Sequence, residues 1–217
     1  MESQEKIQSR EAAGVMLAKR IAHLSLTNAV VVGIPHGGAA VASAIAEELS
    51  LPMEIISCRK IKHPVSSAGN MGSVSGNEVL LHDHSHSLPQ NYLSFQTNRL
   101  RREIKAETDF YYGNRPRPDF EFRTVIIADD VLTSPDTLLA CIKDIRNQLP
   151  LRIIVAVPFV GAEAARVIQA ESDELVFLRM QQSINSPSEF YIDFPAIRDW
   201  DVKEMLQRSK GELVLIN

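Results

Sequence analysis

The sequence predicts an α/β fold of three layers, in which helices cover both faces of a mostly parallel central sheet and a small hood or flap region is added. Short apolar, β-branched runs alternate with helical patterns, which is the order of parallel strands joined by crossover helices. The 217 residues, 45% of them hydrophobic, suffice for one good core. We therefore expect one domain over residues 1–217, with the hood or flap at about 60–88 and a C-terminal segment at about 183–217.

The first third of the chain is predicted to form a helix, a strand, a second helix and a second strand. Residues 9–24 carry apolar side chains at helical spacing, and Ser9 is placed to cap this helix. Residues 29–34, AVVVGI, are almost all apolar, which is typical of a strand covered on both faces. A second helical pattern follows at 39–49, and PMEIISC at 52–58 is the next expected strand.

The middle of the chain interrupts the alternation with a segment rich in Gly, Ser, Asn and His. We expect a long loop there, with a hairpin whose strands lie near 72–75 and 78–82. Ser87 and Gln90 form a capping box for a long helix that ends near Tyr111. After a Pro-rich connector, strand, helix, strand, helix and strand are expected at 123–129, 135–148, 152–159, 161–171 and 174–180. A strand-like aromatic piece and a short helix follow.

The charge and the start of the chain argue against two classes of partner, nucleic acids and membranes. A net charge of −4 and a pI near 5.9 provide no basic field for a nucleic-acid backbone. The first residues lack the apolar run of a secretory signal, so we expect a cytoplasmic protein. Residues 24–46 carry no Lys, Arg, Asp or Glu, but Gly37 and Gly38 at their middle favour strand, loop and helix over a membrane span. Cys58 and Cys141 are expected to be buried thiols.

Two loops that follow predicted strands have unusual composition, and ligands of parallel sheets bind beyond the carboxyl ends of the strands. In GIPHGGAAVA, Gly37 and Gly38 allow positive φ and close approach of backbone N–H groups to an anion at a helix start. The alternative is a tight turn without a ligand. In CRKIKHP, the cations Arg59, Lys60 and Lys62 cluster where the chain leaves the sheet, although ordinary surface charge gives the same pattern.

The third unusual loop is TVIIADDVLTSPDT, where two carboxylates, Asp129 and Asp130, directly follow a buried-type strand. Adjacent carboxylates can accept two vicinal hydroxyls of a sugar or lie beside a metal ion. The helix that begins just beyond can hold a phosphate through its free N–H groups. The sequence thus outlines a sugar-phosphate site, unless these acids are only the polar end of a strand.

These motifs, in this order and spacing, resemble the type I phosphoribosyltransferases, and within them an uncharacterised bacterial subgroup of predicted phosphoribosyltransferases. VIIADDVLTSPDT is similar to the family's phosphoribosyl-pyrophosphate motif, and PHGGAAVA is similar to its pyrophosphate loop. RKI, GNMGSV, the opening REAAGVMLAKRIA and the late FYIDF look like further pieces of the subgroup. The resemblance covers nearly the whole chain and implies the phosphoribosyltransferase form of the three-layer fold.

The resemblance implies a role for each matching residue in a transferase of nucleotide metabolism. Its substrates are phosphoribosyl pyrophosphate and a nucleobase or related acceptor, its cofactor is Mg²⁺, and homodimers are common. Asp129 and Asp130 would bind the ribose hydroxyls directly or through the metal, and Lys60 would neutralise the pyrophosphate. A flap within residues 61–82 would exclude water. The substrate contacts would come from the phosphate loop, Thr133, Ser134, Pro135, Asp136 and Thr137, and from the pyrophosphate side, His36, Gly37, Gly38 and Arg59.

Two residues depart from the family pattern, and a third, Asp136, adds a negative charge to the phosphate loop. His36 stands where the subgroup has Arg, and Pro135, which has no N–H, stands where the phosphate loop has a small residue. SPDT is also a good helix start, with Ser134 as N-cap, Pro135 as first residue and Asp136 in the first turn. Asp136 would repel a phosphate by about 1 to 4 kcal/mol at ~4 Å.

The departures leave other functions open. One is a phosphoribosyltransferase-fold protein that has lost catalysis and binds a nucleotide or a protein partner for regulation. Another is a hydrolase of nucleotides or sugar phosphates that uses the same acids and metal. A separate cluster, HDHSH, has residue types that suit zinc, but a solvated turn is the favoured interpretation of His82, Asp83, His84 and His86.

Overall fold

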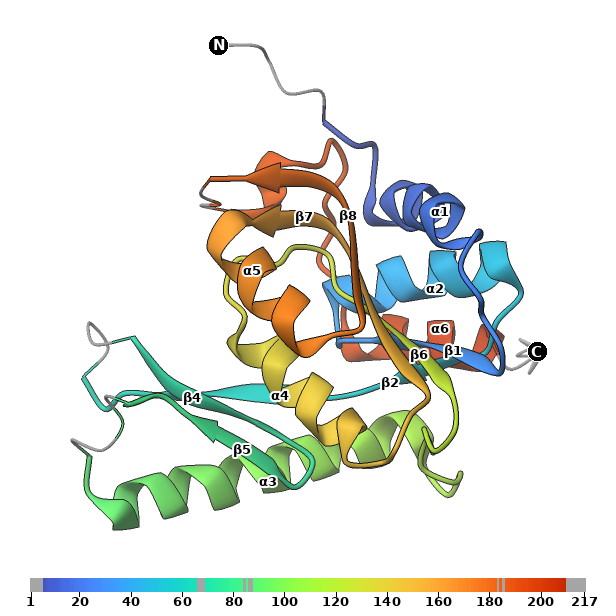
Figure 1. The fold of residues 1–217 in the computed structure, drawn as a ribbon. Helices are drawn as coiled ribbons and strands as arrows, with labels where there is room; N and C mark the ends of the chain where they lie inside the picture. Colours follow the sequence, from blue (N-terminus) through green and yellow to red (C-terminus); the bar gives the residue numbers. More distant parts are fainter. Residues whose placement is uncertain are drawn as a thin grey trace.

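The centre of the molecule is a five-stranded parallel sheet, seen in a computed structural model that describes residues 6–65, 69–83, 85, 88–182, 184 and 186–209. Figure 1 shows this sheet with helices on both sides. The strands lie in the order β2 (Met53–Ile55), β1 (Ala29–Gly33), β6 (Thr124–Ala128), β7 (Arg152–Gly161) and β8 (Glu174–Gln181). Every neighbouring pair is parallel. All residues of β1, β2 and β6 are buried, which is why these strands are continuous apolar runs.

Helices cover both faces of this sheet, as the alternation predicts. On one face, α1 (Arg10–Ile21), α2 (Gly37–Leu49) and α6 (Asp199–Arg208) pack on alternate strand residues such as Val31 and Ile126. On the other face, α4 (Asp136–Arg146) and α5 (Ala162–Glu171) pack on the residues between them, such as Val30 and Ile127. Because strand side chains alternate between faces, each strand supplies both cores. The predicted three-layer α/β fold is confirmed.

A second, three-stranded antiparallel sheet lies beside α3 and extends away from the main sheet (Figure 1). It consists of β3 (Cys58–Lys62), β4 (Asn70–Ser75) and β5 (Glu78–Leu81), and α3 spans Gln90–Tyr112. Leu93, Leu100 and Ile104 of α3 pack against Ile61, Met71 and Val74 of this sheet. The predicted hairpin is therefore present, and β3 joins it as a third strand.

Several predicted boundaries differ from the structure, and three of them bear on the site. The strand expected at 52–58 is two strands, because the chain leaves the main sheet after Ile55 and enters the second sheet at Cys58. Helix α3 begins at Gln90 after Pro89, with no side-chain cap, and the predicted cap Ser87 lies outside the described residues. Helix α4 begins one residue later than expected, at Asp136, after Pro135.

The aromatic segment near the end is a packing segment and not a regular strand. Its Tyr191 forms an isolated parallel bridge with Ile7, and the short helix η3 (Pro187–Glu189) precedes it. Phe190 stacks on Phe159 of β7 with ring centres 4.4 Å apart, and Tyr191 meets the same ring edge-on. These contacts fix the segment that leads into α6 against the end of the main sheet.

The run without Lys, Arg, Asp or Glu divides into β1 and α2, as expected. Within the described ranges, no helix combines the length and the apolar character needed to cross a membrane. Cys58 and Cys141 are free and buried, which confirms their predicted state.

Candidate functional site

The candidate site lies where the loops after β1 and β6 meet, at the carboxyl ends of two neighbouring parallel strands. The chain leaves β1 through α2 on one face of the sheet and leaves β6 through α4 on the other face. The two loops therefore diverge to opposite faces of the sheet, at the position where open α/β sheets bind ligands. Gly37 and Gly38 come from the first loop, and Asp129 and Asp130 from the second.

Gly37 and Gly38 are required by close approach between the two loops. A Cβ atom at Gly37 would lie 2.0 Å from Oδ2 of Asp130, and one at Gly38 would lie 2.7 Å from the carbonyl oxygen of Ala128. Any side chain at either position would therefore push the acidic loop away. The expected positive φ is not at these glycines but at His36, with φ 70° and ψ −111°. A non-glycine backbone held in such a region costs on the order of 1–3 kcal/mol.

Asp129 is a carboxyl group whose surroundings favour its protonated form. Burial and the neighbouring Asp130 carboxylate raise its pKa well above the usual range, while the positive charge of Lys60 acts in the opposite direction. Oδ1 of Asp129 accepts the backbone N–H of Asp130 at 2.8 Å. Lys60 of β3 thus acts on Asp129 through its charge, whereas Asp129 and Asp130 are in direct contact.

Arg10, which sequence reasoning missed, holds Asp130 in place. Its Nε donates to Oδ2 of Asp130 at 2.8 Å, and the two side chains are only 8% and 15% exposed. A second guanidinium nitrogen donates to the carbonyl of Pro195 at 2.8 Å, and the group lies 3.6 Å from the ring centre of Phe194. The hydroxyl of Tyr191 donates to the backbone carbonyl of Asp130 at 2.8 Å. The aromatic segment thereby positions the acidic loop.

The predicted phosphate loop, Thr133 to Thr137, continues from Asp130 into α4. Nε2 of His82, just beyond β5, lies 3.0 Å from Oδ1 of Asp136, and the Asp136 side chain is mostly buried. The hydroxyl of Ser73 donates to the Asp136 carbonyl at 2.7 Å, and the Cys58 thiol donates to the Thr137 carbonyl at 3.3 Å. The second sheet is therefore bound to the start of α4. In the HDHSH cluster, His84 and His86 lie outside the described residues, and the favoured solvated turn stays a prediction.

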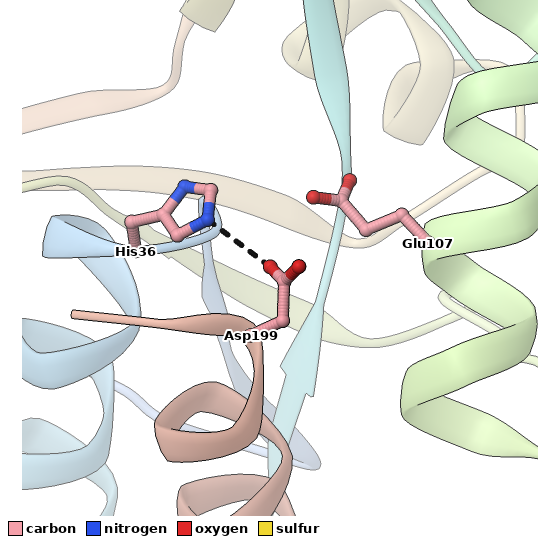
Figure 2. Close-up of side chains that lie close together, drawn as sticks. All are labelled: His36, Glu107 and Asp199. Atoms are coloured by element: carbon pink, nitrogen blue, oxygen red, sulfur yellow. Dashed lines mark hydrogen bonds and ion pairs between the residues drawn. The ribbon is translucent and has the colours of Figure 1, made fainter.

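Arg59 and His36, predicted to border the pyrophosphate, make contacts that the sequence does not reveal. Arg59 donates to Oε1 of Glu107 at 2.7 Å, and this partner helps to raise the pKa of the guanidinium. Nε2 of His36 lies 3.1 Å from Oδ1 of Asp199, which also accepts the Tyr111 hydroxyl at 2.9 Å. Figure 2 shows His36, Glu107 and Asp199 pointing toward one another.

Comparison with known proteins gives the family. The family model described as "Phosphoribosyl transferase domain" matches residues 3–194. A Mycobacterium tuberculosis protein named "Putative phosphoribosyl transferase" is 25% identical over 204 residues, which are 92% of this chain and 46% of that protein. The chain thus spans about half the length of the curated relatives it matches.

Solved structures agree on the fold. The crystal structure of TT1426 from Thermus thermophilus has a TM-score of 0.81 and 29% identity, over 94% of this chain and 99% of that one. A purine phosphoribosyltransferase from Pyrococcus horikoshii, at 18% identity, shares the fold with a TM-score of 0.50 over 87% of this chain and 92% of its own. With its family model covering most of the sequence and its fold shared with such structures, the chain belongs to the phosphoribosyl transferase domain family.

Proposed function

We propose that the protein transfers a 5-phosphoribosyl group between phosphoribosyl pyrophosphate and a nucleobase or a related acceptor. The observation that carries this proposal is the packing of Asp129 and Asp130 against Gly37 and Gly38 where the β1 and β6 loops meet. Two carboxylates at this place can accept the vicinal hydroxyls of a ribose. Family membership supports the same reaction class.

The residues around the candidate site divide into three proposed roles. Asp129 and Asp130 hold the ribose, and Asp129 steadies the positive charge that develops on the sugar as the anomeric bond breaks. Lys60 and Arg59 neutralise the pyrophosphate beside His36 and the backbone of Gly37 and Gly38. The loop Thr133, Ser134, Pro135, Asp136 and Thr137 receives the 5-phosphate, which is compatible with the Asp136 carboxylate being engaged by His82.

The donor set of the acidic loop fits Mg²⁺, which we propose as the cofactor. The described hydrogen bonds use Oδ1 of Asp129 and Oδ2 of Asp130, and Mg²⁺ prefers oxygen ligands of this kind. The raised pKa of Asp129 is a second indication, because burial and the Asp130 carboxylate both disfavour the charged form, and a bound cation would offset this effect. Bound Mg²⁺ would neutralise the charge of the pyrophosphate group.

The second sheet and its connection, about residues 60–88, are the proposed flap. Its contacts with Asp136 at the start of α4 and with Asp144 near the end of α4 hold it along this helix, beside the proposed phosphate loop. Water must be kept from a reacting sugar because an oxocarbenium-like centre would otherwise be hydrolysed. In this position, the second sheet would exclude water from the reacting sugar.

The proposal is tested by incubating the protein with phosphoribosyl pyrophosphate, Mg²⁺ and a panel of nucleobases, and by measuring released pyrophosphate. We expect turnover with at least one base. Asp129→Asn keeps the size of the side chain but removes its charge, and it should lower kcat/KM at least about 100-fold, in the range of electrostatic groups in active sites. Absence of turnover with every base, together with no calorimetric binding of phosphoribosyl pyrophosphate, would refute the proposal.

A regulatory protein without catalysis is the second candidate, and Pro135 favours it. This residue directly precedes α4 and has no N–H to donate to a phosphate, while Asp136 places a negative charge in the first turn. The double variant Pro135→Gly, Asp136→Ala separates the two candidates. Phosphoribosyl pyrophosphate binding that is present only in the variant would support the regulatory function, whereas tight binding by the unmodified protein would eliminate it.

A further inference from the structure

Three side chains with metal-ligand chemistry converge beside the candidate site, and they come from three separate segments. His36 lies between β1 and α2, Glu107 belongs to the second half of α3, and Asp199 is the first residue of α6. One ligand atom from each lies within 4.8 Å of those from the other two. Figure 2 shows that the imidazole and both carboxylates point into the same space. The fold, and not a local turn, creates this arrangement.

Glu107 is the most informative member, because its carboxylate is buried and only half satisfied. The side chain is 8% exposed, and its Oε1 accepts Arg59 at 2.7 Å. Its Oε2 is buried and has no hydrogen-bond partner among the described residues. A buried carboxylate oxygen without a partner is costly to retain. A cation bound at this oxygen would remove that cost.

The charge balance of the cluster also favours a cation. Two carboxylates, Glu107 and Asp199, face one guanidinium, that of Arg59, which is tied to Glu107. His36 is a neutral ligand when it binds a metal. One negative charge of the cluster therefore remains for a bound ion to balance.

The separations need only small adjustments to close around an ion. Metal bonds of about 2.0–2.2 Å in a tetrahedral site place ligand atoms about 3.4 Å apart. Nε2 of His36 and Oδ1 of Asp199 are 3.1 Å apart already, and the most distant pair would have to close by no more than about 1.4 Å. The side chains of His36 and Asp199 are 48% and 54% exposed, so both can rotate to do so.

Neighbouring groups orient the carboxylates without using all their oxygens. The Tyr111 hydroxyl can donate to Oδ1 of Asp199 at 2.9 Å or to Oε1 of Glu107 at 3.3 Å, and Arg59 donates to the same Oε1 of Glu107. Hydrogen bonds of this kind commonly fix the ligands of metal sites.

We propose that His36, Glu107 and Asp199 bind a divalent transition-metal cation such as Zn²⁺. An imidazole with two carboxylates suits zinc and similar ions, whereas Mg²⁺ prefers oxygen ligands alone. Three protein ligands leave a further coordination position open to water or to an anion. The site is separate from the Mg²⁺ site proposed at Asp129 and Asp130, and it does not rest on the phosphoribosyl transfer activity.

The test is a zinc titration of chelator-treated protein without phosphoribosyl pyrophosphate, read by competition with a chromogenic zinc chelator. We expect one tight Zn²⁺ per chain that a large excess of Mg²⁺ does not displace. Asp199→Asn, Glu107→Gln and His36→Asn should each weaken binding at least tenfold, and Asn is chosen because it tolerates positive φ. Asp201→Asn is the matched control, because Asp201 lies in the same helix and contacts Arg198 instead. Circular dichroism confirms that each variant is folded.

Three outcomes would overturn the proposal. One is the absence of a 1:1 zinc complex with the unmodified protein. Another is zinc affinity that is unchanged in Asp199→Asn and His36→Asn but lost in a His84→Gln, His86→Gln variant, which would assign the metal to the HDHSH segment. The third is an anomalous scattering peak, in crystals grown with Zn²⁺, at Asp129 and Asp130 in place of His36. Failure of the transferase assay would leave this test unaffected.

Discussion

At the scale of single residues, Arg10 determines how Asp130 is presented. The guanidinium is buried, stacks on Phe194 and holds one carboxylate oxygen, so the acid has a single orientation against Gly37. The second oxygen remains for a ligand. A charged residue on the buried face of α1 thus sets the position of a proposed catalytic group 120 residues away in the chain.

Replacing Arg10 should cost stability, because it leaves the Asp130 carboxylate buried without its cation. Arg10→Met should lower the free energy of unfolding by about 3–5 kcal/mol, the range for breaking one side of a buried ion pair. Urea unfolding measures this change. Lys19→Met is the control, since Lys19 is an exposed cation of the same helix, and it should have an effect within about 0.5 kcal/mol. Equal effects of the two substitutions would contradict the role assigned to Arg10.

From the raised pKa of Asp129 we expect that this residue lowers the stability of the fold while it serves the proposed activity. Its pKa is raised in the folded protein, so its contribution to stability is present below the unfolded pKa and is lost as the pH rises through the folded pKa. At pH 7, well above the unfolded pKa of an Asp, the raised folded pKa of Asp129 therefore lowers the stability of the fold. Asp129→Asn should unfold at a higher temperature than the unmodified protein at pH 7, and this difference should shrink as the pH falls toward 4. An equal or lower Tm at pH 7 would show that the carboxylate is compensated by its surroundings.

At the scale of elements, the charge at the start of α4 favours helix stability but opposes the binding of a phosphate. Asp136 stabilises the helix N-terminus electrostatically and contacts His82 of the second sheet, yet its charge lies where a 5-phosphate is proposed to bind. The side chain points toward the sheet, which places the charge on the flap side of the loop. The Asp136 carboxylate therefore stabilises the helix N-terminus and also contacts the proposed flap.

The variant Asp136→Asn should separate the effect of this charge on stability from its effect on phosphate binding. The amide can still contact His82, but the loss of charge at the helix N-terminus should cost about 0.3–1 kcal/mol of stability. Phosphoribosyl pyrophosphate should bind several-fold more tightly, because one negative charge near the phosphate is removed. Glu163→Gln, in the first turn of α5, is the control for the helix effect and should leave this binding unchanged. Weaker binding in Asp136→Asn would mean that the carboxylate itself holds the substrate or its metal.

The elements also show what the sequence could and could not predict. The apolar runs of β1, β2, β6 and β7 are almost entirely buried, whereas β8 at the sheet edge is only partly buried, and the alternation predicted the main sheet correctly. PMEIISC was wrong as one strand because an apolar run does not show where the chain passes from one sheet to another. Asp129, Asp130, Gly37 and Gly38 could be predicted as site residues because they lie in loops that follow strands.

Other site residues were missed because their partners are remote in the sequence. Glu107 and Asp199 look like ordinary charges on helices, and only the fold places them beside His36. Arg10 did leave a signal, since it falls on the same helical face as the buried Ala13 and Leu17. An Arg on the apolar face of an amphipathic helix is a reason to look for a buried carboxylate.

At the scale of the whole molecule, α3 links the second sheet to the main body. Its first half packs on β3 and β4, while its last residues, Tyr111 and Tyr112, enter the core beneath α2 and α6 (Figure 1). The Tyr112 hydroxyl donates to Oε2 of Glu54 at 2.8 Å and accepts the backbone N–H of Ile55 at 2.9 Å, so it is joined to β2. A displacement at one end of this helix should therefore be transmitted to the proposed flap.

Tyr112→Phe tests this link. Loss of the hydroxyl removes the acceptor for the buried N–H of Ile55, and the free energy of unfolding should fall by about 1–3 kcal/mol. If α3 is the rigid connection, amide hydrogen exchange should accelerate in β3, β4 and β5 as well as in β2. Tyr92→Phe is the matched control. Tyr92 lies at the other end of α3, and its exposed hydroxyl donates to the Lys62 carbonyl. Faster exchange in β2 alone after Tyr112→Phe would show that the second sheet moves independently of the main body, and the flap would then have to be positioned by its contacts with α4.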